Sequence, residues 1–353
     1  MPKRKPEIKI GEKTVNSEAP IYIIAELSGN HNQNYSIAKK TIKAAKDAGA
    51  DAIKLQTYTA DTITLDSKKD DFTIKDGSHW NRKNLYDLYK QAYTPWDWQP
   101  KLKKYAESIG LQCFSSPFDY TAVDFLEKMN VPAYKIASYE ITDIPLIEYV
   151  AKKRKPVILS TGVAQSNDIK EAVAACRRVG NNQIAILKCT SAYPTPLEEV
   201  NLRTIPDIAR KYSVVSGISD HTMGSTVSLA ACCLGAKIVE KHLILDRKLG
   251  GPDAFFSMEP SDLRQLVQSI RDIEKALGEV TYTLTPSAKK ARWNVRSLYA
   301  VKDIVKGEKI TMDNTRSIRP GFGLHPKYLK KILGKKVKRD IAKGTPLSFG
   351  LVD

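Results

Sequence analysis

The sequence lacks the features that mark secreted, membrane-spanning and disulfide-stabilised proteins. Its five cysteines, among 353 residues, form no C-x-x-C pair and no even-numbered framework, which predicts reduced thiols in a cytoplasmic protein. No apolar run approaches the length of a bilayer span, and no apolar segment follows the charged N-terminus as in a secretory signal. We therefore expect no membrane partner, and a chain of this length can bury a large core.

Acidic residues are in the minority. The chain has 39 Asp and Glu against 56 Lys and Arg, a net charge of +17. This excess allows two interpretations, a nucleic-acid surface or a field that attracts small anionic substrates. The basic residues are spread along the chain without a recognition helix, an RNP-type aromatic motif or a zinc finger. We favour the second interpretation and expect no nucleic-acid partner.

A G-x-G-x-x-G motif is missing after the first predicted strand, which argues against an open dinucleotide-binding sheet. Instead, short apolar runs alternate with helical stretches. Eight strand–helix units across roughly 250 residues predict a (β/α)₈ TIM barrel, an α/β fold, over residues 1–278. The predicted strands begin at Ile21, Ala52, Leu111, Ala133, Pro156, Ile184, Val214 and Ala236.

The composition changes after the eighth unit. Residues 279–294 form a polar linker, and residues 295–353 contain short strand-like runs separated by Gly and Pro. Two phrases there nearly repeat, V-K-D-I-V-K-G-E and V-K-R-D-I-A-K-G-T, which indicates an internal pseudo-repeat. We expect a small second domain whose size is marginal for folding alone.

Two of the five histidines, His221 and His242, lie just past the carboxyl ends of two consecutive predicted strands. The carboxyl ends of parallel strands meet at one rim of the sheet, where ligands bind in such folds. Each histidine could be a structural residue. Two imidazoles at equivalent positions nevertheless favour a borderline divalent metal, which would polarise a carbonyl or activate water.

Polar side chains gather at the same predicted rim. Burying an unpaired ammonium is costly, so Lys54 and Lys135 near strand ends predict an anion site for phosphate or carboxylate. Either lysine could instead pair with a carboxylate such as Glu140, and Glu26 could be a base, a hydroxyl holder or a lysine partner. These groups indicate condensation of a phosphorylated small molecule with a carbonyl compound. The rim residues are Glu26, Lys54, Gln56, Ser116, Lys135, Ser138, Glu140, Ser160, Thr161, Thr190, Ser191, Tyr193, Ser219, Asp220, His221, Lys241, His242 and Asp253.

Across nearly its whole length the chain resembles the sialic acid synthase family. The motifs that carry this resemblance are I-A-E-L-S-G-N-H-N, K-L-Q-T-Y, S-S-P-F-D, K-I-A-S-Y-E, L-S-T-G, K-C-T-S-A-Y-P-T-P, I-S-D-H-T-M-G and E-K-H-L-I-L-D-R. The tail with R-P-G at 319–321 resembles that family's SAF (antifreeze-like) domain, a β-clip fold. The segments Y-T-A-D-T-I-T-L-D, L-Y-D-L-Y-K-Q-A-Y-T-P-W and G-G-P-D-A-F-F-S-M-E-P are most similar to the pseudaminic acid branch. The branches that make N-acetylneuraminic and legionaminic acid are the near alternatives.

The resemblance implies a transferase that condenses phosphoenolpyruvate with 2,4-diacetamido-2,4,6-trideoxy-L-altrose, giving pseudaminate and phosphate by C–O cleavage. It implies that His221 and His242 hold Mn²⁺, with Mg²⁺ or Co²⁺ as alternatives, and that Glu26 is the acid/base or hydroxyl-orienting group. It implies that Gln56, Tyr193, Asp253 and Arg319 bind the sugar, with Arg319 supplied by the partner subunit of a domain-swapped homodimer. The residues it assigns to phosphoenolpyruvate are Lys54, Ser116, Lys135, Ser138, Ser160, Ser191 and Ser219.

Some of these assignments leave a second role open. Ser116 and Ser191 stand where sialic acid synthases carry other polar residues. Phe255 and Phe256 would face the deoxygenated, methyl-bearing end of the sugar, or they would pack in the core.

Two other classes of protein fit the residues. A barrel aldolase or lyase would use Lys54 or Lys135 as a Schiff-base amine and would be trapped by borohydride. A non-enzymatic binding protein would use the tail as a carbohydrate module and bind DNA with steep salt dependence.

Overall fold

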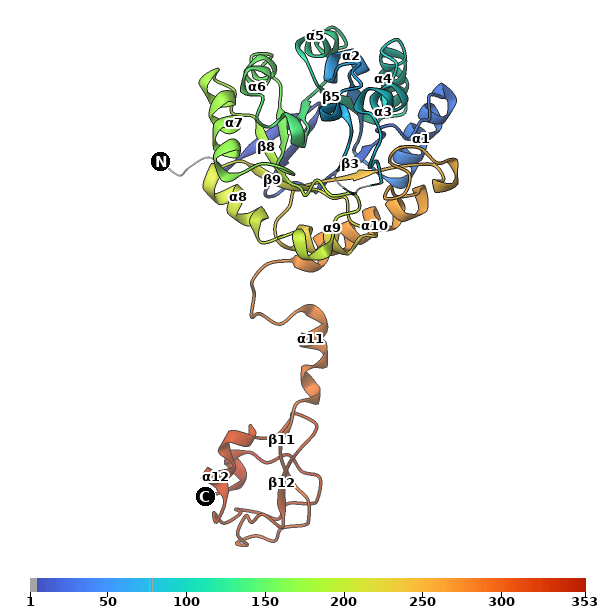
Figure 1. Cartoon of the computed structure of the whole chain (residues 1–353). Helices are drawn as coiled ribbons and strands as arrows, with labels where there is room; N and C mark the ends of the chain where they lie inside the picture. The colour runs from blue at the N-terminus through green and yellow to red at the C-terminus, as the bar shows by residue number, and fades with distance from the viewer. Residues whose placement is uncertain (1–4, 76, 78) are drawn as a thin grey trace. The chain divides into compact units, whose positions relative to one another are not determined.

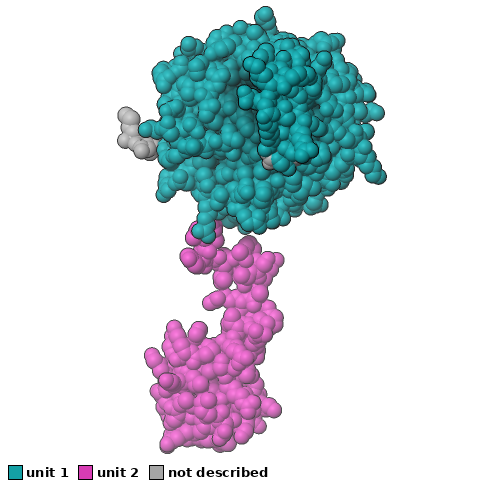
Figure 2. Space-filling model, in the orientation of Figure 1, with its two compact units in different colours: residues 1–278 teal, residues 279–353 magenta. Residues whose placement is uncertain are grey.

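A computed structural model of the chain describes residues 5–75, 77 and 79–353. The chain divides into two compact units, Met1–Gly278 and Glu279–Asp353 (Figures 1 and 2).

Eight parallel strands close into a barrel in the first unit, which confirms the predicted fold (Figure 1). The strands follow one another around the barrel in chain order, and β10 pairs with β3 to close it. The eight strands are β3 (Tyr22–Glu26), β4 (Ala52–Thr57), β5 (Gln112–Pro117), β6 (Tyr134–Ile136), β7 (Val157–Ser160), β8 (Ile184–Lys188), β9 (Val215–Ser219) and β10 (Ile238–His242).

Helices surround this barrel (Figure 1). The first, α1, begins after Asn34, whose side chain accepts hydrogen bonds from two backbone N–H groups. It ends at Gly49, which adopts the left-handed conformation (φ 91°) that glycine tolerates. The helices that follow the strands are α1 (Tyr35–Ala48), α4 (Gln99–Ser108), α5 (Tyr120–Lys128), α6 (Ile144–Ala151), α7 (Ser166–Arg178), α8 (Thr204–Tyr212), α9 (Thr226–Cys233) and α10 (Pro260–Leu277).

The core lies inside the barrel and between its strands and helices. All five residues of β3 are buried, as expected for a strand of a parallel sheet that is covered on both faces. The closing pair of strands aligns Ile238 with Tyr22 and, at the other end, His242 with Glu26. The fold therefore brings a predicted metal ligand next to a predicted acid/base residue.

The remaining elements of the first unit are short. An antiparallel hairpin precedes the barrel, and its apolar residues Ile8, Ile10 and Val15 are buried in the core. The hairpin consists of β1 (Glu7–Ile10) and β2 (Lys13–Asn16). Connections in the barrel unit contain α2 (Ala60–Ile63), η1 (Asp70–Phe72), α3 (Leu85–Ala92), η2 (Ser138–Glu140), η3 (Leu197–Glu199) and η4 (Arg247–Leu249).

The second unit has its own apolar core around Leu298, Ile304, Ile341 and Leu347. Its two nearly repeated phrases pair with each other, since Ile304 and Ile341 exchange backbone hydrogen bonds of 2.8 and 2.9 Å. Its elements are α11 (Pro286–Ala291), η5 (Arg292–Asn294), β11 (Ser297–Ala300), β12 (Thr315–Ile318), η6 (Pro326–Tyr328), α12 (Leu329–Ile332) and η7 (Phe349–Leu351).

Side-chain contacts of the two phrases are reciprocal as well. The backbone N–H of Lys306 donates to Asp340 at 2.7 Å, and that of Lys343 donates to Asp303 at 2.7 Å. These residues hold equivalent places in the two phrases, so the predicted pseudo-repeat is confirmed. Over the described part of the chain, no helix combines the length and apolar character that a membrane span requires.

Candidate active site

Four buried charges meet inside the barrel at the carboxyl end of its strands. The Nζ atom of Lys54 on β4 lies 2.6 Å from Oε2 of Glu26 on β3 and 3.2 Å from Oε1 of Glu240 on β10. The Nζ atom of Lys135 on β6 lies 3.6 Å from the same Glu240 oxygen. Each of these side chains is at most 5% exposed. Two ammonium groups therefore share two carboxylates out of contact with water.

The two carboxyl groups of this cluster differ in pKa. Burial acts to raise the pKa of Glu240, but Lys135 and Lys54 outweigh it and lower the pKa to about 2. Burial raises the pKa of Glu26 above its usual value, against the attraction of Lys54 and with added repulsion from Glu240. Glu240 is thus the fixed counter-ion of the lysines, whereas Glu26 can hold a proton.

Serine hydroxyls line this charged cluster. Ser219 donates to Oε1 of Glu240 at 2.9 Å, and Nζ of Lys135 donates to the hydroxyl of Ser160 at 2.6 Å. The hydroxyl of Ser116 is buried without a hydrogen-bond partner among the described residues. Hydroxyl and ammonium donors in a closed space fit an anion such as phosphate or carboxylate.

A glycine leaves room beside two more of the predicted serines. The backbone N–H of Gly162, which follows β7, donates to the hydroxyl of Ser138 at 3.1 Å. A Cβ atom at Gly162 would come 2.0 Å from Oγ of Ser191 and 2.7 Å from Oγ of Ser138. The glycine therefore preserves a cradle between the two hydroxyls.

The rings of the two predicted histidines lie edge to face, with centroids 5.3 Å apart and an angle of 71° between their planes. Nδ1 of His221 lies 3.1 Å from the carbonyl oxygen of Thr190. Because a carbonyl only accepts, Nδ1 carries a proton. Burial acts to lower the pKa of His221, but Cys189 and the carbonyl of Thr190 outweigh it and raise that pKa. Burial and the nearby His221 and Lys54 hold the pKa of His242 well below its usual value, so that imidazole is neutral.

This pair fits a divalent ion only in part. Nδ1 of His242 is buried and, among the described residues, has no hydrogen-bond partner, as expected for a nitrogen that binds a ligand. The described part of the chain contains no group of three or more His, Cys, Asp or Glu side chains that could hold a metal. The protein thus offers two imidazoles, of which that of His242 is held neutral, and an ion there would need substrate or water in its other positions.

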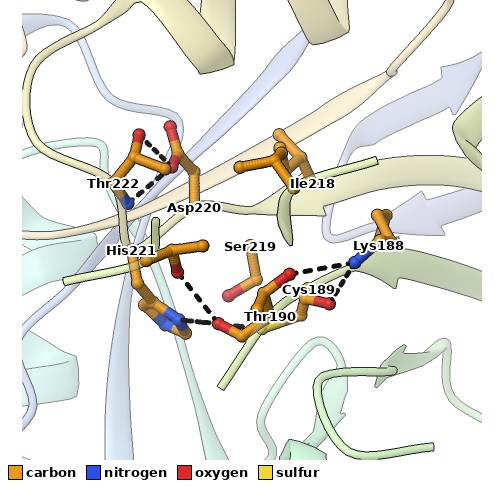
Figure 3. A pocket seen from close by; sticks show the side chains of 10 residues that line it. Lys188, Cys189, Thr190, Ile218, Ser219, Asp220, His221 and Thr222 are labelled. Atoms are coloured by element: carbon orange, nitrogen blue, oxygen red, sulfur yellow. Dashed lines mark hydrogen bonds between the residues drawn. The ribbon is translucent and has the colours of Figure 1, made fainter. Parts of the chain in front are cut away.

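Figure 3 shows how the ends of β8 and β9 support His221. The ring lies against Thr190, and Lys188 turns its Nζ toward the carbonyl of Cys189 (2.6 Å) and the hydroxyl of Thr190 (3.1 Å). A cavity of about 10 Å³ lies between these residues, which is room for one water molecule.

Two predicted sugar-binding residues are linked through a third residue. Nε2 of Gln56 donates to the hydroxyl of Ser28 at 3.2 Å, and that hydroxyl donates to Oδ2 of Asp253. The same Asp253 oxygen lies 3.9 Å from Nδ1 of His242, and the backbone N–H of Ser28 donates to Glu26 at 2.8 Å. Ser28 therefore joins the carboxylate cluster to the histidine pair.

The other predicted sugar contacts fall in different places. Tyr193 packs on His221, with ring centroids 4.4 Å apart, and Phe256 packs on His242 at 4.7 Å. Phe256 is 4% exposed, whereas Phe255 is half-buried. Arg319 belongs to the second unit, next to β12.

Two acidic residues of this site were not predicted to be functional: Glu240 was not identified, and Glu140 was considered only as a rim residue and a possible partner of a lysine. Glu240 was missed because the apolar run of the strand predicted to begin at Ala236 stops at Val239, while β10 continues to His242. Alternation along a strand places Glu240 and His242 on the same face, and this signal could have identified it. Glu140 also has a buried oxygen without a hydrogen-bond partner among the described residues, and burial raises its pKa to about 7.

Two residues of the predicted polar rim have a structural role instead. Nζ of Lys241 points away from the cluster, lying 3.2 Å from Asp220 and donating to the carbonyl of Thr222 at 2.6 Å. Asp220 in turn accepts from the hydroxyls of Thr222 (2.7 Å) and Ser228 (2.6 Å). This pair stabilises the connection between β9 and α9.

Comparison with known proteins identifies the chain's relatives. The NeuB family profile matches residues 41–282, and the SAF domain profile matches residues 295–352. A pseudaminic acid synthase of Helicobacter pylori is 45% identical over 330 residues, which is 93% of this chain and 97% of that protein. An N,N'-diacetyllegionaminic acid synthase of Campylobacter jejuni is 37% identical over 326 residues, 90% of this chain and 97% of its own length.

A solved structure of a related enzyme has the same fold. The N-acetylneuraminic acid (sialic acid) synthetase of Leptospira borgpetersenii superimposes with a TM-score of 0.72 at 32% identity, covering 81% of this chain and 95% of that one. The matched profiles cover both units, and the relatives match along nearly the whole chain. The chain therefore belongs to the NeuB family, the sialic acid synthases that carry a C-terminal SAF domain.

Proposed function

We propose that the chain is a pseudaminic acid synthase. It condenses phosphoenolpyruvate with 2,4-diacetamido-2,4,6-trideoxy-L-altrose and releases pseudaminate and phosphate. The observation that carries this proposal is a closed anion site, built on Lys54 and Lys135, beside two neighbouring imidazoles. The greater identity to a pseudaminic acid synthase than to a legionaminic acid synthase supports the choice of sugar.

Phosphoenolpyruvate would lie among the lysines and serines at the carboxyl ends of the strands. Its phosphate and carboxylate need several donors, and charge-assisted hydrogen bonds from ammonium groups are the strongest available. The fixed charge of Glu240 keeps both lysines oriented until the anion arrives. The donors are Lys54, Lys135, Ser116, Ser138, Ser160, Ser191 and Ser219.

In the reaction, C3 of phosphoenolpyruvate forms a bond to the aldehyde carbon of the open-chain sugar, and the aldehyde oxygen takes up a proton. Water then adds at C2, and the resulting tetrahedral intermediate expels phosphate as the C2–O bond breaks. Glu26, whose raised pKa lets it hold a proton in this closed site, is the group placed to donate one or to orient a sugar hydroxyl.

His221 and His242 would hold a divalent ion, Mn²⁺ by ligand preference, with Mg²⁺ or Co²⁺ as alternatives. When bound, the ion would supply Lewis-acid polarisation of the sugar carbonyl. The chain's own contribution is to hold the two rings side by side, with the ring of His221 oriented by the contact between its Nδ1 and the carbonyl of Thr190.

The sugar would contact Gln56, Tyr193 and Asp253 of one subunit and Arg319 of the partner subunit in a domain-swapped homodimer. Apolar side chains exposed on successive loops at the carboxyl end of the barrel support such a cover: Val163, Leu197, Met223 and Leu249 are each between 43% and 63% exposed. A second copy that covers them would remove this surface from water.

The five cysteines are all unpaired, and four of them are buried. This supports the cytoplasm, a reducing compartment, as the place where the enzyme works.

The test is phosphate release from phosphoenolpyruvate with Mn²⁺ and separately offered sugars. We expect release with the altrose derivative, and little with its legionaminic counterpart or N-acetylmannosamine. Chelation of the metal or His242→Ala should lower the rate by at least about 100-fold. His325→Ala, on the second unit, is the matched control and should keep the rate.

Other outcomes would identify the alternatives. Release with only N-acetylmannosamine would retain the family and reject the choice of sugar. Metal-independent turnover with borohydride trapping at Lys54 or Lys135 would instead indicate a Schiff-base aldolase.

A further inference from the structure

Four aromatic side chains next to the histidine pair pack against one another, so that each ring contacts two of the others. The ring centroids of Trp80 and Tyr193 are 5.3 Å apart, and those of Tyr193 and Phe256 are 5.1 Å apart. Phe256 and Phe255 follow at 5.1 Å, and Phe255 returns to Trp80 at 6.0 Å. We call these four residues the aromatic wall. They come from three connections, those that follow β4, β8 and β10.

The aromatic wall rests directly on the proposed metal ligands. Tyr193 lies on the ring of His221 (4.4 Å between centroids), and Phe256 lies on His242 (4.7 Å). Phe256 is fully buried, but Trp80, Tyr193 and Phe255 remain half-buried. Three ring surfaces are therefore partly accessible beside the place where a carbonyl would be polarised.

Trp80 is held in this position by the loop that follows β10, a strand that only β3 separates from β4 in the barrel. Its indole N–H donates to the carbonyl oxygen of Pro252 at 3.0 Å, one residue before Asp253, a predicted sugar contact. The neighbouring His79 stacks on Phe255 with ring centroids 4.4 Å apart. The long connection between β4 and α4 is thereby tied to the loop after β10.

We propose that Trp80 is a specificity-determining residue, which completes an apolar surface for the deoxygenated, methyl-bearing end of the sugar. This inference rests on the proposed function. Tyr193 contributes the one hydroxyl of the aromatic wall. Elsewhere on it the indole N–H of Trp80 is already engaged by Pro252, and the phenyl rings of Phe255 and Phe256 carry no polar group. A hydroxyl placed against this surface loses water and gains little in exchange, whereas a methyl group gains contact.

The size of the effect follows from hydrophobic discrimination in other enzymes. One methyl or methylene group in an apolar pocket changes kcat/KM by roughly 10- to 200-fold. We therefore expect the chain to prefer the 6-deoxy sugar over its 6-hydroxy counterpart by at least about tenfold.

The experiment measures kcat/KM for both sugars in the metal-loaded full chain and in its variants. Trp80→Ala should lower the ratio of the two values at least about tenfold, mainly by slowing the 6-deoxy sugar. Trp80→Phe keeps an aromatic face and should retain most of the preference. This variant also keeps the inference testable if the alanine variant does not fold. The KM for phosphoenolpyruvate should stay unchanged in both.

Trp96→Phe is the matched control. Trp96 also donates its indole N–H to a backbone carbonyl, that of Tyr58 at 3.0 Å, and it packs on Phe125 rather than on the aromatic wall. Its substitution removes the same kind of hydrogen bond and should leave the ratio as it is.

Two results would overturn the inference. One is equal loss of both sugars in Trp80→Ala with an unchanged ratio, which would make Trp80 a packing residue. The other is a native chain that uses both sugars equally well. Failure of the proposed function would look different, since the native chain would then release no phosphate with any acetamido sugar.

Discussion

At the scale of single residues, Glu240 compensates the charge of two buried lysines. Its carboxylate lies 3.2 Å from Lys54 and 3.6 Å from Lys135. Glu240→Gln would leave one ammonium charge uncompensated in the interior, a change that costs about 3–5 kcal/mol in other proteins. We expect a loss of about 3 kcal/mol in the free energy of unfolding, measured by urea denaturation.

A surface ion pair provides the control for Glu240. Glu107 lies 2.6 Å from Lys103 but is 45% exposed, and exposed pairs contribute at most about 1 kcal/mol. Equal losses for Glu240→Gln and Glu107→Gln would contradict the role assigned to Glu240.

Glu140 makes stability depend on pH. Burial raises its pKa from 4.5 to about 7, so the folded chain binds this proton more tightly than the unfolded chain. Its contribution to stability is therefore lost as the pH rises from the unfolded pKa, 4.5, through the folded pKa of about 7. The loss amounts to at most about 3 kcal/mol.

Glu140→Gln tests this effect because it removes the titration and keeps the shape. Urea denaturation at pH 5 and pH 8 should show a smaller decrease in the variant than in the native chain. An identical decrease in both would rule out Glu140 as the source.

Residue types at strand ends could be predicted because charge at the end of a buried strand is unusual. Lys54, Lys135, His221 and His242 were identified in this way, and the structure brings them together. Glu240 could not be identified from the apolar run alone, since that run ends before it. Which charges face inward depends on the register of the closed barrel, as the outward direction of Lys241 shows.

At the scale of elements, the turn after β7 forms the cradle between Ser138 and Ser191. Gly162→Ala would place a methyl group in that space, 2.0 Å from one hydroxyl and 2.7 Å from the other. We expect the KM for phosphoenolpyruvate to rise at least about tenfold, because small displacements of binding groups are costly. Steady-state kinetics with and without the substitution measures the change.

The control for the cradle is another glycine in open space. At Gly350 a Cβ atom would meet only Ser348, at 3.8 Å. Gly350→Ala should leave the KM unchanged. A Gly162→Ala enzyme with native KM would show that no substrate enters the cradle.

Most elements of the barrel could be predicted because buried parallel strands form continuous apolar runs. The predicted starts at Ala52 and Ile184 are those of β4 and β8, and the other six strands begin within two residues of their predicted start. The strand β2 and the helix α3 were not predicted. Both are short and each contains a single buried residue, so that packing against neighbours, rather than an apolar pattern, determines them.

At the scale of the whole molecule, a site shared between subunits can be tested by complementation. In a domain-swapped dimer, His242→Ala inactivates the barrel and Arg319→Ala inactivates the cover. An equal mixture of the two variants forms half heterodimers, each with one intact site, so about a quarter of the native activity should return.

The two variants must be unfolded and refolded together so that the subunits can exchange. Phosphate release is the measurement, and each variant refolded alone is the control. A mixture as inactive as its components would show that each chain completes its own site.

The closure of the barrel between β3 and β10 also imposes an order in time. Glu26 and its neighbour in the register, His242, are separated by 216 residues (242 − 26). At a synthesis rate of about 5–20 residues per second, the first strand waits roughly 10–40 s for its last partner. During that interval β3 has an open edge that could pair with other chains. A nascent chain therefore lacks the complete charge cluster and the histidine pair until the last strand has left the ribosome.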